Sequence, residues 1–426
     1  MQIRPFRGWQ YKTTNGDVSK LVAPPYDILS ADDKQQLLAA SPVNIVSVDM
    51  PHVPPKELGP DEVYRQAAAR LAQWQQSGVM VQSDQPAIYA YEQTFAWAGR
   101  TFSRRALLCG VRASELGKEV IPHEHTFAGP KADRLKLMQY TSMQLSPIFG
   151  FFEGKDAADT LWSAVKGEPT LHGELRGVTE KLWAITDPQV ISAVAGKLSA
   201  KPVFIADGHH RYTTALNYRD WLVEQKGAIG AEHEANFVMF ALVEKADEGL
   251  LVLPTHRIIR GLSSNFDLAK LMSAAPEFSW QRLPAEADFG NADALLAPFG
   301  EHSLAFVGPG AKELWVGTLK DISAMAQAAG DQLPAWRELD VAILHKLIVD
   351  RALSAFKTPQ TAIDYTPDGP AVLDACRHSD AQLGVCMQGT PLAAVETIAR
   401  AGASMPHKST YFYPKLATGM VLKPLE

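Results

Sequence analysis

The chain has 426 residues, of which 46% are hydrophobic and 21% are charged, a balance typical of a soluble globular protein. This length exceeds one ordinary hydrophobic core, so we expect several domains or one large elaborated domain. The formal net charge of −6 gives no electrostatic reason to expect a nucleic-acid-binding protein. No apolar run approaches about 18 residues, so no membrane span is predicted.

The cysteines point to a reducing compartment. Cys109, Cys376 and Cys386 are far apart, odd in number and in no spacing typical of metal or redox sites. The first residues do not have the pattern of a secretory signal peptide. We therefore expect a cytoplasmic protein, and self-association into a homo-oligomer stays open.

The first elements in chain order are predicted helices. Ser30, followed three residues later by Asp33, is typical of a capped helix start. A second helix is predicted over 61–76, ended by Gly78. Its apolar face is expected to be Val63, Ala67, Leu71 and Trp74.

Strands and further helices follow. Residues 88–97 and 101–111 predict a hairpin around Ala98-Gly99-Arg100. A helix is predicted to begin near Asp133. Further along, the patterns predict strands at 236–243 and 250–254, a hairpin over 303–319 and a helix over 338–352.

The most informative stretch is Lys201–Leu222, KPVFIADGHHRYTTALNYRDWL. An apolar run suited to a buried strand is followed by the polar turn Asp207–Arg211 and then by helical periodicity. The free N–H groups at a helix start attract anions, and glycine allows a ligand to approach the backbone. Arg211 has the planar fork that suits phosphate or carboxylate. This pattern predicts a phosphate-handling site at the turn, lining the principal pocket of the chain.

A purely structural interpretation of the same turn stays open. Its histidines and arginine are compatible with a solvated strand end, and Asp207 with a simple helix cap. Five polar or special residues directly after a buried strand favour the functional interpretation.

A second polar cluster is His123-Glu124-His125, with Arg134 shortly after it. Residues two apart on a strand share a face, so both imidazoles could reach one point. A transition-metal site would need further ligands from Asp207, His209 or His210. A pair of surface histidines explains the pattern equally well.

A third cluster is Lys408-Ser409-Thr410. Lysine and neighbouring hydroxyls can hold phosphate, although the glycines of a Walker A loop are absent. A polar end on a packed aromatic strand is the alternative. Because polar groups buried in isolation are costly, we expect the three clusters to converge on one pocket.

The landmarks together resemble a bacterial and archaeal family designated a domain of unknown function. The stretches that carry this resemblance, over nearly the whole chain, are RPFRG, APPYD, HEHT with DRL, SPIF, ADGHHRY, LPTHR and MPHKSTYFYPKL.

The box Asp207–Arg211 is also similar, more distantly, to that of the ParB–sulfiredoxin superfamily, whose members include nucleotide-binding partition proteins, sulfiredoxin and kinases of free serine. This resemblance implies that Gly208, His209 and Arg211 grip phosphates and that Asp207 assists metal binding or proton transfer. The chain is much longer than those proteins, and histidines stand where the sulfiredoxin cysteine would be. Sulfiredoxin activity and DNA partition are therefore not expected.

We expect a mixed α/β (α+β) fold with a ParB/sulfiredoxin-like core elaborated by additional α/β segments. The expected divisions are a core over 1–260, a scaffold or lid over 261–335, and a C-terminal segment over 336–426 that returns to the site.

The expected function is nucleotide-dependent phosphoryl transfer, with ATP and Mg²⁺, to a small metabolite such as a hydroxy amino acid, serine included. The alternatives are a metal-dependent phosphatase or hydrolase, with His123, His125, Asp207 and His209 as ligands, and a non-enzymatic nucleotide-binding switch. The expected catalytic residues are Asp207, Glu124 and His209, and the expected magnesium ligands are Asp207 and Glu124. The expected nucleotide-binding residues are Gly208, His209, His210, Arg211, His123, His125, Arg134, Lys408, Ser409 and Thr410.

Overall fold

The computed structural model describes residues 1–54, 57–124, 128–378 and 381–426. The chain forms two compact units, one of residues Met1–Leu250 with Pro414–Glu426 (unit 1) and one of residues Leu251–Tyr413 (unit 2). The sequence-based divisions were placed differently. The segment 261–335 shares unit 2 with most of 336–426, and only the last thirteen residues, Pro414–Glu426, return to unit 1.

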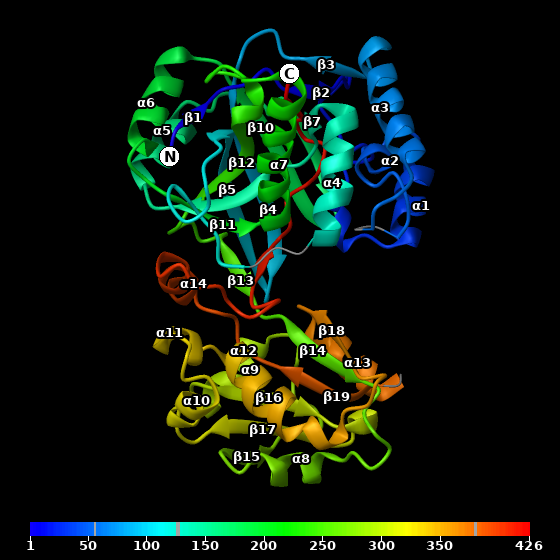
Figure 1. Ribbon diagram of the computed structural model, residues 1–426, viewed down its shortest axis with the longest axis vertical. Helices are drawn as coiled ribbons and strands as arrows, with labels where there is room; N and C mark the ends of the chain where they lie inside the picture. The colour runs from blue at the N-terminus through cyan, green and yellow to red at the C-terminus, as the bar shows by residue number, and fades with distance from the viewer. Residues whose placement is uncertain (55–56, 125–127, 379–380) are drawn as a thin grey trace. The chain divides into compact units, whose positions relative to one another are not determined.

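Unit 1 is built on a mixed nine-stranded sheet with the order β6-β11-β8-β12-β5-β4-β10-β9, and β1 pairs with β5 (Figure 1). The strands are β1 (Ile3–Arg4), β4 (Ile88–Trp97), β5 (Arg100–Arg112), β6 (Val120–Ile121), β8 (Ile148–Phe152), β9 (Leu171–Leu175), β10 (Val178–Ile185), β11 (Val203–Asp207) and β12 (Phe237–Glu244). Two small ladders join β2 (Trp9–Tyr11) to β3 (Met80–Gln82) and β7 (Met143–Gln144) to β21 (Lys423–Pro424).

The helices of unit 1 are α1 (Ala31–Ala40), α2 (Val46–Asp49), α3 (Asp61–Gln76), α4 (Ala128–Thr141), α5 (Lys155–Ser163), α6 (Pro188–Leu198) and α7 (His209–Lys226), with short 3-10 turns η1 (Tyr26–Ile28) and η2 (Glu234–Asn236). Figure 1 shows α4 and α7 side by side, and α5 next to α6. The buried face of α7, which includes Tyr212, Ala215, Tyr218 and Leu222, joins the apolar core under the sheet.

Unit 2 has a six-stranded antiparallel sheet with the order β15-β17-β16-β19-β14-β18. Its strands are β14 (His256–Arg260), β15 (Phe278–Arg282), β16 (Ser303–Val307), β17 (Leu314–Leu319), β18 (Ala362–Thr366) and β19 (Ala381–Cys386), and β13 (Leu251–Leu253) pairs separately with β20 (Tyr411–Tyr413). Its helices are α8 (Leu268–Ala274), α9 (Ala292–Leu296), α10 (Ser323–Ala328), α11 (Pro334–Arg337), α12 (Asp340–Ile343), α13 (Gly369–His378) and α14 (Leu392–Arg400), with turns η3 (Ala297–Phe299), η4 (Pro309–Ala311) and η6 (Ser354–Phe356).

Most local predictions are confirmed, and the mixed α/β class is correct. Ser30 and Asp33 form the predicted capping box. The 61–76 helix has its predicted bounds, although Tyr64 rather than Val63 is buried on its inner face. The helix expected to begin near Asp133 begins earlier, at Ala128.

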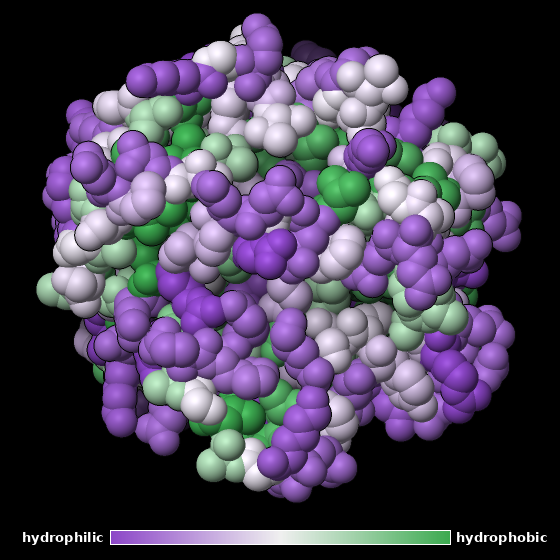
Figure 2. Space-filling view, turned by 90° about the horizontal axis from the view of Figure 1, so that it is seen from above, coloured by the Kyte–Doolittle hydropathy of each residue, from purple (hydrophilic) through white to green (hydrophobic). Residues whose placement is uncertain are grey.

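The predicted helix over 338–352 is also present, but α12 continues into a wider π-helical turn, η5 (Leu344–Ala352). Among the described residues, none of the helices has the length and apolar character needed to cross a membrane. The face drawn in Figure 2 is largely hydrophilic, with small scattered hydrophobic areas.

Candidate functional site

The strand–turn–helix predicted around Gly208 is present in unit 1. β11 ends at Asp207, Gly208 adopts a left-handed conformation with φ 100°, and α7 begins at His209. Gly208, at the cap position, has no side chain that could accept from the first N–H groups of α7. The turn therefore has the backbone geometry of an anion site.

Two cations lie on the carboxylate of Asp207. Arg211 Nη2 lies 2.7 Å from Oδ2, and Lys415 Nζ lies 2.8 Å from Oδ1. Burial alone would raise the pKa of Asp207, but Lys415 and Arg211 hold it well below its ordinary value. Because both carboxylate oxygens are engaged, Asp207 does not fit the predicted role of magnesium ligand while these ion pairs persist.

Arg211 is fixed from a second side by the segment that enters β8. Its Nη1 donates to Ser146 Oγ at 3.2 Å and to the carbonyl of Pro147 at 2.6 Å. β8 runs antiparallel to β11, so the residues before β8 lie beside the end of β11. This pairing explains why SPIF and ADGHHRY meet in space.

His123 and His209 come together because β6 and β11 are parallel neighbours that end at the same edge of the sheet. Their rings are 4.6 Å apart, and the N–H of His123 donates to His209 Nε2 at 3.2 Å. Burial lowers the pKa of His123 to about 4 and that of His209 well below its ordinary value. Both rings are therefore neutral at pH 7 and bring no positive charge to a phosphate.

Arg134 lies in a buried ionic network at the other side of the turn. It donates to the carbonyl of Asp49 at 2.6 Å, pairs with Asp49 Oδ1 at 3.2 Å and with Asp133 Oδ2 at 2.6 Å, and lies 3.9 Å over the Tyr26 ring. Burial opposes its charge, but Asp49 and Asp133 raise the pKa of Arg134. Asp133 also accepts from Tyr64 Oη at 2.7 Å.

Arg134 and Arg211 line one cavity of about 50 Å³, which has room for a few water molecules. The other lining residues are Asp49, Leu137, Met138, Met143, Gln144, Leu145, Ser146, Ile148, Thr214, Val238 and Met239. A larger cavity of about 740 Å³ lies in unit 2, around His302 and Asp340. Of the predicted turn, Arg211 lines the first of these two cavities, and Asp207, Gly208, His209 and His210 line neither.

The other predicted site residues are placed as follows. His210 is half-buried in the first turn of α7, and Glu124 is half-buried directly after His123. His125 lies outside the described residues. Lys408, Ser409 and Thr410 belong to unit 2, with Ser409 buried and Lys408 exposed.

Within 1–54, 57–124, 128–378 and 381–426, the side chains form no group of three or more His, Cys, Asp or Glu able to hold a metal ion.

Sequence reasoning left Lys415 and Asp49 out of the site. Three hydrogen bonds hold the segment that carries Lys415: Arg104 Nη2 donates to the Pro414 carbonyl at 2.6 Å, Gln93 Nε2 to the Lys415 carbonyl at 3.1 Å, and the Ala417 N–H to Tyr91 Oη at 3.3 Å. Lys415 belongs to the MPHKSTYFYPKL landmark, so a signal existed. The stretch around Asp49 has no distinguishing pattern.

A family comparison matches residues 3–342 to the family described as "Protein of unknown function (DUF1015)". The chain belongs to this family. Among curated proteins, none matches it. Family membership confirms the kinship expected from the landmarks.

Three solved structures are distantly similar. A free serine kinase in complex with AMP is 12% identical, with a TM-score of 0.33, covering 74% of this chain and 92% of its own. A conserved hypothetical protein from Pyrococcus furiosus is 11% identical, with a TM-score of 0.33, covering 74% and 95%. C-terminally truncated SbnI from Staphylococcus aureus is 11% identical, with a TM-score of 0.35, covering 75% and 87%. Such similarity does not assign an activity to this chain.

Proposed function

We propose that the turn Asp207–Arg211 binds the phosphates of a nucleoside triphosphate, most simply ATP. We further propose that unit 1 transfers a phosphoryl group to the hydroxyl of a small metabolite, such as serine or another hydroxy amino acid. The observation that carries this proposal is the start of α7 directly behind left-handed Gly208, with Arg211 and Lys415 placed together at the turn.

The parts of the turn suit different aspects of phosphate binding. The first N–H groups of α7 supply directed donors, and the helix dipole favours a negative charge there. Arg211 supplies a planar fork and Lys415 a point charge. Asp207 keeps both cations in place, which is a positioning role. Magnesium enters as the MgATP complex, since Mg²⁺ is commonly held by phosphates and water.

The assignment of the base differs from the sequence prediction for a physical reason. A carboxylate whose pKa is strongly lowered is a weak proton acceptor, and Asp207 has two cations on its oxygens. We therefore assign the role of base to Glu124, which would accept the proton of the substrate hydroxyl. Glu124 follows β6 beside the turn. A carboxylate is adequate because phosphoryl transfer demands little early proton removal. His209 supports the turn, because its Nε2 already accepts a hydrogen bond from His123.

The binding part is tested by calorimetric titration of ATP and ADP, with and without Mg²⁺, into the full chain. Arg211→Ala should weaken ATP binding about ten- to a hundredfold, the scale of a lost charge-assisted hydrogen bond. Arg219→Ala is the matched control, since Arg219 lies on the same helix and, among the described residues, pairs only with its neighbour Asp220. Unchanged ATP affinity in Arg211→Ala would show that Arg211 is structural.

The catalytic part is tested by ADP release in the presence of hydroxy amino acids. ADP formed together with a phosphorylated amino acid supports the transferase, and Glu124→Gln should then lower turnover more than ATP affinity. Phosphate released without an acceptor identifies a hydrolase instead. ATP binding without turnover identifies a nucleotide-binding switch.

A further inference from the structure

Arg257, in the LPTHR stretch of unit 2, is a fully buried cation with no carboxylate partner among the described residues of that unit. It is 0% exposed, on β14. Its Nη1 donates to the Thr255 carbonyl, and its Nη2 contacts His345 Nε2 at 3.3 Å and donates to the carbonyls of His407 at 3.3 Å and Lys408 at 3.0 Å. In the described part of unit 2, no carboxylate lies within ion-pair distance of it.

Carbonyl groups satisfy the donors of a guanidinium but do not neutralise its charge. An ionised group taken out of water is costly unless an opposite charge lies beside it. Arg257 Nε and the buried Thr255 Oγ1 also lack a hydrogen-bond partner among the described residues. The buried charge and these unsatisfied atoms indicate that an opposite charge is missing beside Arg257.

Tyr365 and His345, which contact the guanidinium of Arg257, do not neutralise its charge. Its register partner on β18 is Tyr365, whose ring lies 5.0 Å from the guanidinium carbon and 5.9 Å from the His407 ring. Burial, together with the charge of Arg257, lowers the pKa of His345 to about 4. Asp350 also acts on His345, but this carboxylate lies within 4 Å of the ammonium groups of Lys346 and Lys357.

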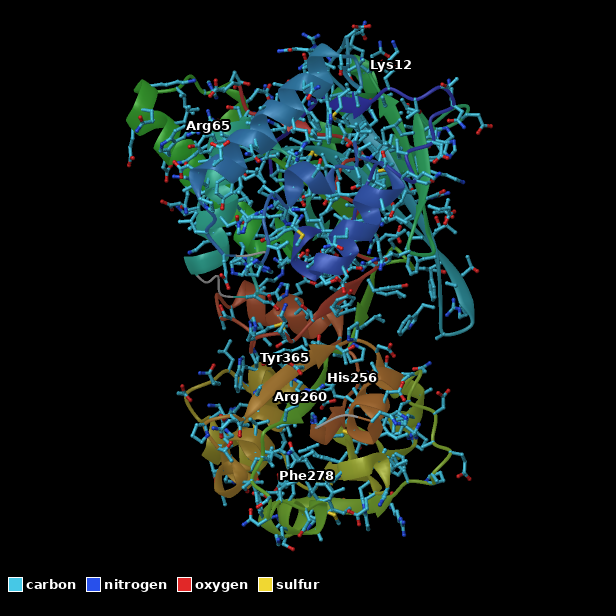
Figure 3. The ribbon with its side chains drawn as sticks, turned by 90° about the vertical axis from the view of Figure 1, so that its right-hand side faces the viewer. Lys12, Arg65, His256, Arg260, Phe278 and Tyr365 are labelled. Atoms are coloured by element: carbon cyan, nitrogen blue, oxygen red, sulfur yellow. The ribbon has the colours of Figure 1, made fainter. Side chains whose placement is uncertain are left out.

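Two unusual backbone features lie within this cluster. Lys408 adopts a left-handed conformation with φ 57°, unusual for a residue with a side chain, and Arg257 holds its carbonyl. His345 lies in the π-helical turn η5, and such turns are frequent at functional sites. Figure 3 labels Tyr365 and His256 on the paired strands β18 and β14, away from Phe278 on β15, the opposite edge strand.

We propose that unit 2 binds an oxyanion, the phosphate or carboxylate group of a small molecule, on His345, His407 and Lys408 beside buried Arg257. Lys408 and His407 are exposed and supply the direct contacts. The neutral His345 accepts from Arg257 through Nε2 and offers its Nδ1–H as a donor. The bound anion completes the charge balance of Arg257. This site is independent of the nucleotide proposal, because all its residues belong to unit 2.

The test uses the full chain carrying Arg211→Ala, which weakens the turn of unit 1 as a competing anion site. Inorganic phosphate and succinate are titrated by calorimetry into this chain alone, with added Lys408→Gln, and with added Lys312→Gln. Lys312 is an exposed lysine of unit 2 outside the cluster and is the matched control. We expect binding of one of the two anions, about tenfold weaker with Lys408→Gln and unchanged with Lys312→Gln.

Ring NMR signals of His345 and His407, assigned through His345→Gln and His407→Gln, locate the site in the unaltered chain. They should move on addition of the binding anion and should move equally in Arg211→Ala. Phosphate binding identifies a phosphate ligand, and succinate binding a carboxylate ligand. Binding of neither anion, equal affinity with Lys408→Gln, or ring signals that do not respond would each overturn the proposal. Loss of ATP binding in Arg211→Ala leaves it unaffected.

Discussion

Lys415 Nζ lies 2.8 Å from Asp207 Oδ1, although 208 residues separate them along the chain. The lysine is brought there by the backbone of Pro414–Ala417, which is held by Arg104, Gln93 and Tyr91. Asp207 thereby holds one cation from its own turn and one from the C-terminal segment. The positive charge at the turn therefore comes from both Arg211 and Lys415.

Lys415→Met should weaken ATP binding about tenfold, because one of the two cations at the turn is lost. The free energy of unfolding should fall by about 1–3 kcal/mol, since Asp207 keeps only Arg211. Urea unfolding and calorimetric titration measure the two effects. Lys415→Arg keeps the charge and should recover most of the affinity. Full ATP affinity in Lys415→Met would exclude the lysine from the phosphate site.

Gly208→Ala should lower both stability and ATP affinity. The left-handed backbone costs about 1–2 kcal/mol for a residue with a side chain. A Cβ there would lie 3.1 Å from two nitrogens of the Arg211 guanidinium. Gly78→Ala is the control, since Gly78 also has a positive φ but nothing lies within 4 Å of its added Cβ. Both variants should lose similar stability in urea, and only Gly208→Ala should bind ATP more weakly. Equal ATP affinities would contradict this.

Arg134→Met should destabilise unit 1 by about 3–5 kcal/mol, because Asp49 and Asp133 would remain buried without their cation. Adding Asp49→Asn removes one of the two unpaired buried charges and should restore part of the lost stability. Chemical unfolding of the two single variants and the double variant gives the coupling free energy. Strictly additive losses would show that the buried pair is not coupled.

Glu180 should make stability fall as the pH rises. It is buried, accepts from Tyr91 Oη and from Gln93 Nε2 at 3.0 Å, and burial raises its pKa from 4.5 to about 7. Between these values the folded chain holds a proton that the unfolded chain has lost. The contribution of Glu180 to the free energy of unfolding is therefore complete below about pH 4.5. It falls by up to about 3 kcal/mol towards pH 7.

The matched variant for this pH effect is Glu180→Gln, which cannot ionise. Urea unfolding at several pH values should show the stability of the variant rising relative to the parent chain between pH 4.5 and 7. Parallel pH profiles would mean that Glu180 titrates normally.

Local sequence rules predicted the parts of the fold that are decided locally. The capping box at Ser30, the Ala98-Gly99 turn of the first hairpin and the strand–turn–helix at Gly208 each depend on neighbouring residues. Turn chemistry and periodicity suffice for such features. The backbone geometry of the candidate site at the α7 start was predictable to the same extent.

The remaining parts depend on contacts between distant segments. Tertiary packing decides that Asp49 contacts Arg134 and that Lys415 contacts Asp207. Local patterns in a single sequence do not predict such contacts. The π-helical turn at His345 has the same 338–352 apolar pattern as an ordinary helix. The ionised state of Asp207 likewise follows from its distant partner.

The C-terminal segment also bears on the order in which the chain can fold. β21 pairs with β7, and Lys423 is fully buried against Glu234, so unit 1 contains residues from both ends of the chain. Unit 2 is one continuous stretch, Leu251–Tyr413. During synthesis, unit 2 can fold as soon as it has emerged from the ribosome. Unit 1 also needs β21, so its β7–β21 ladder forms only after the whole of unit 2 has been synthesised.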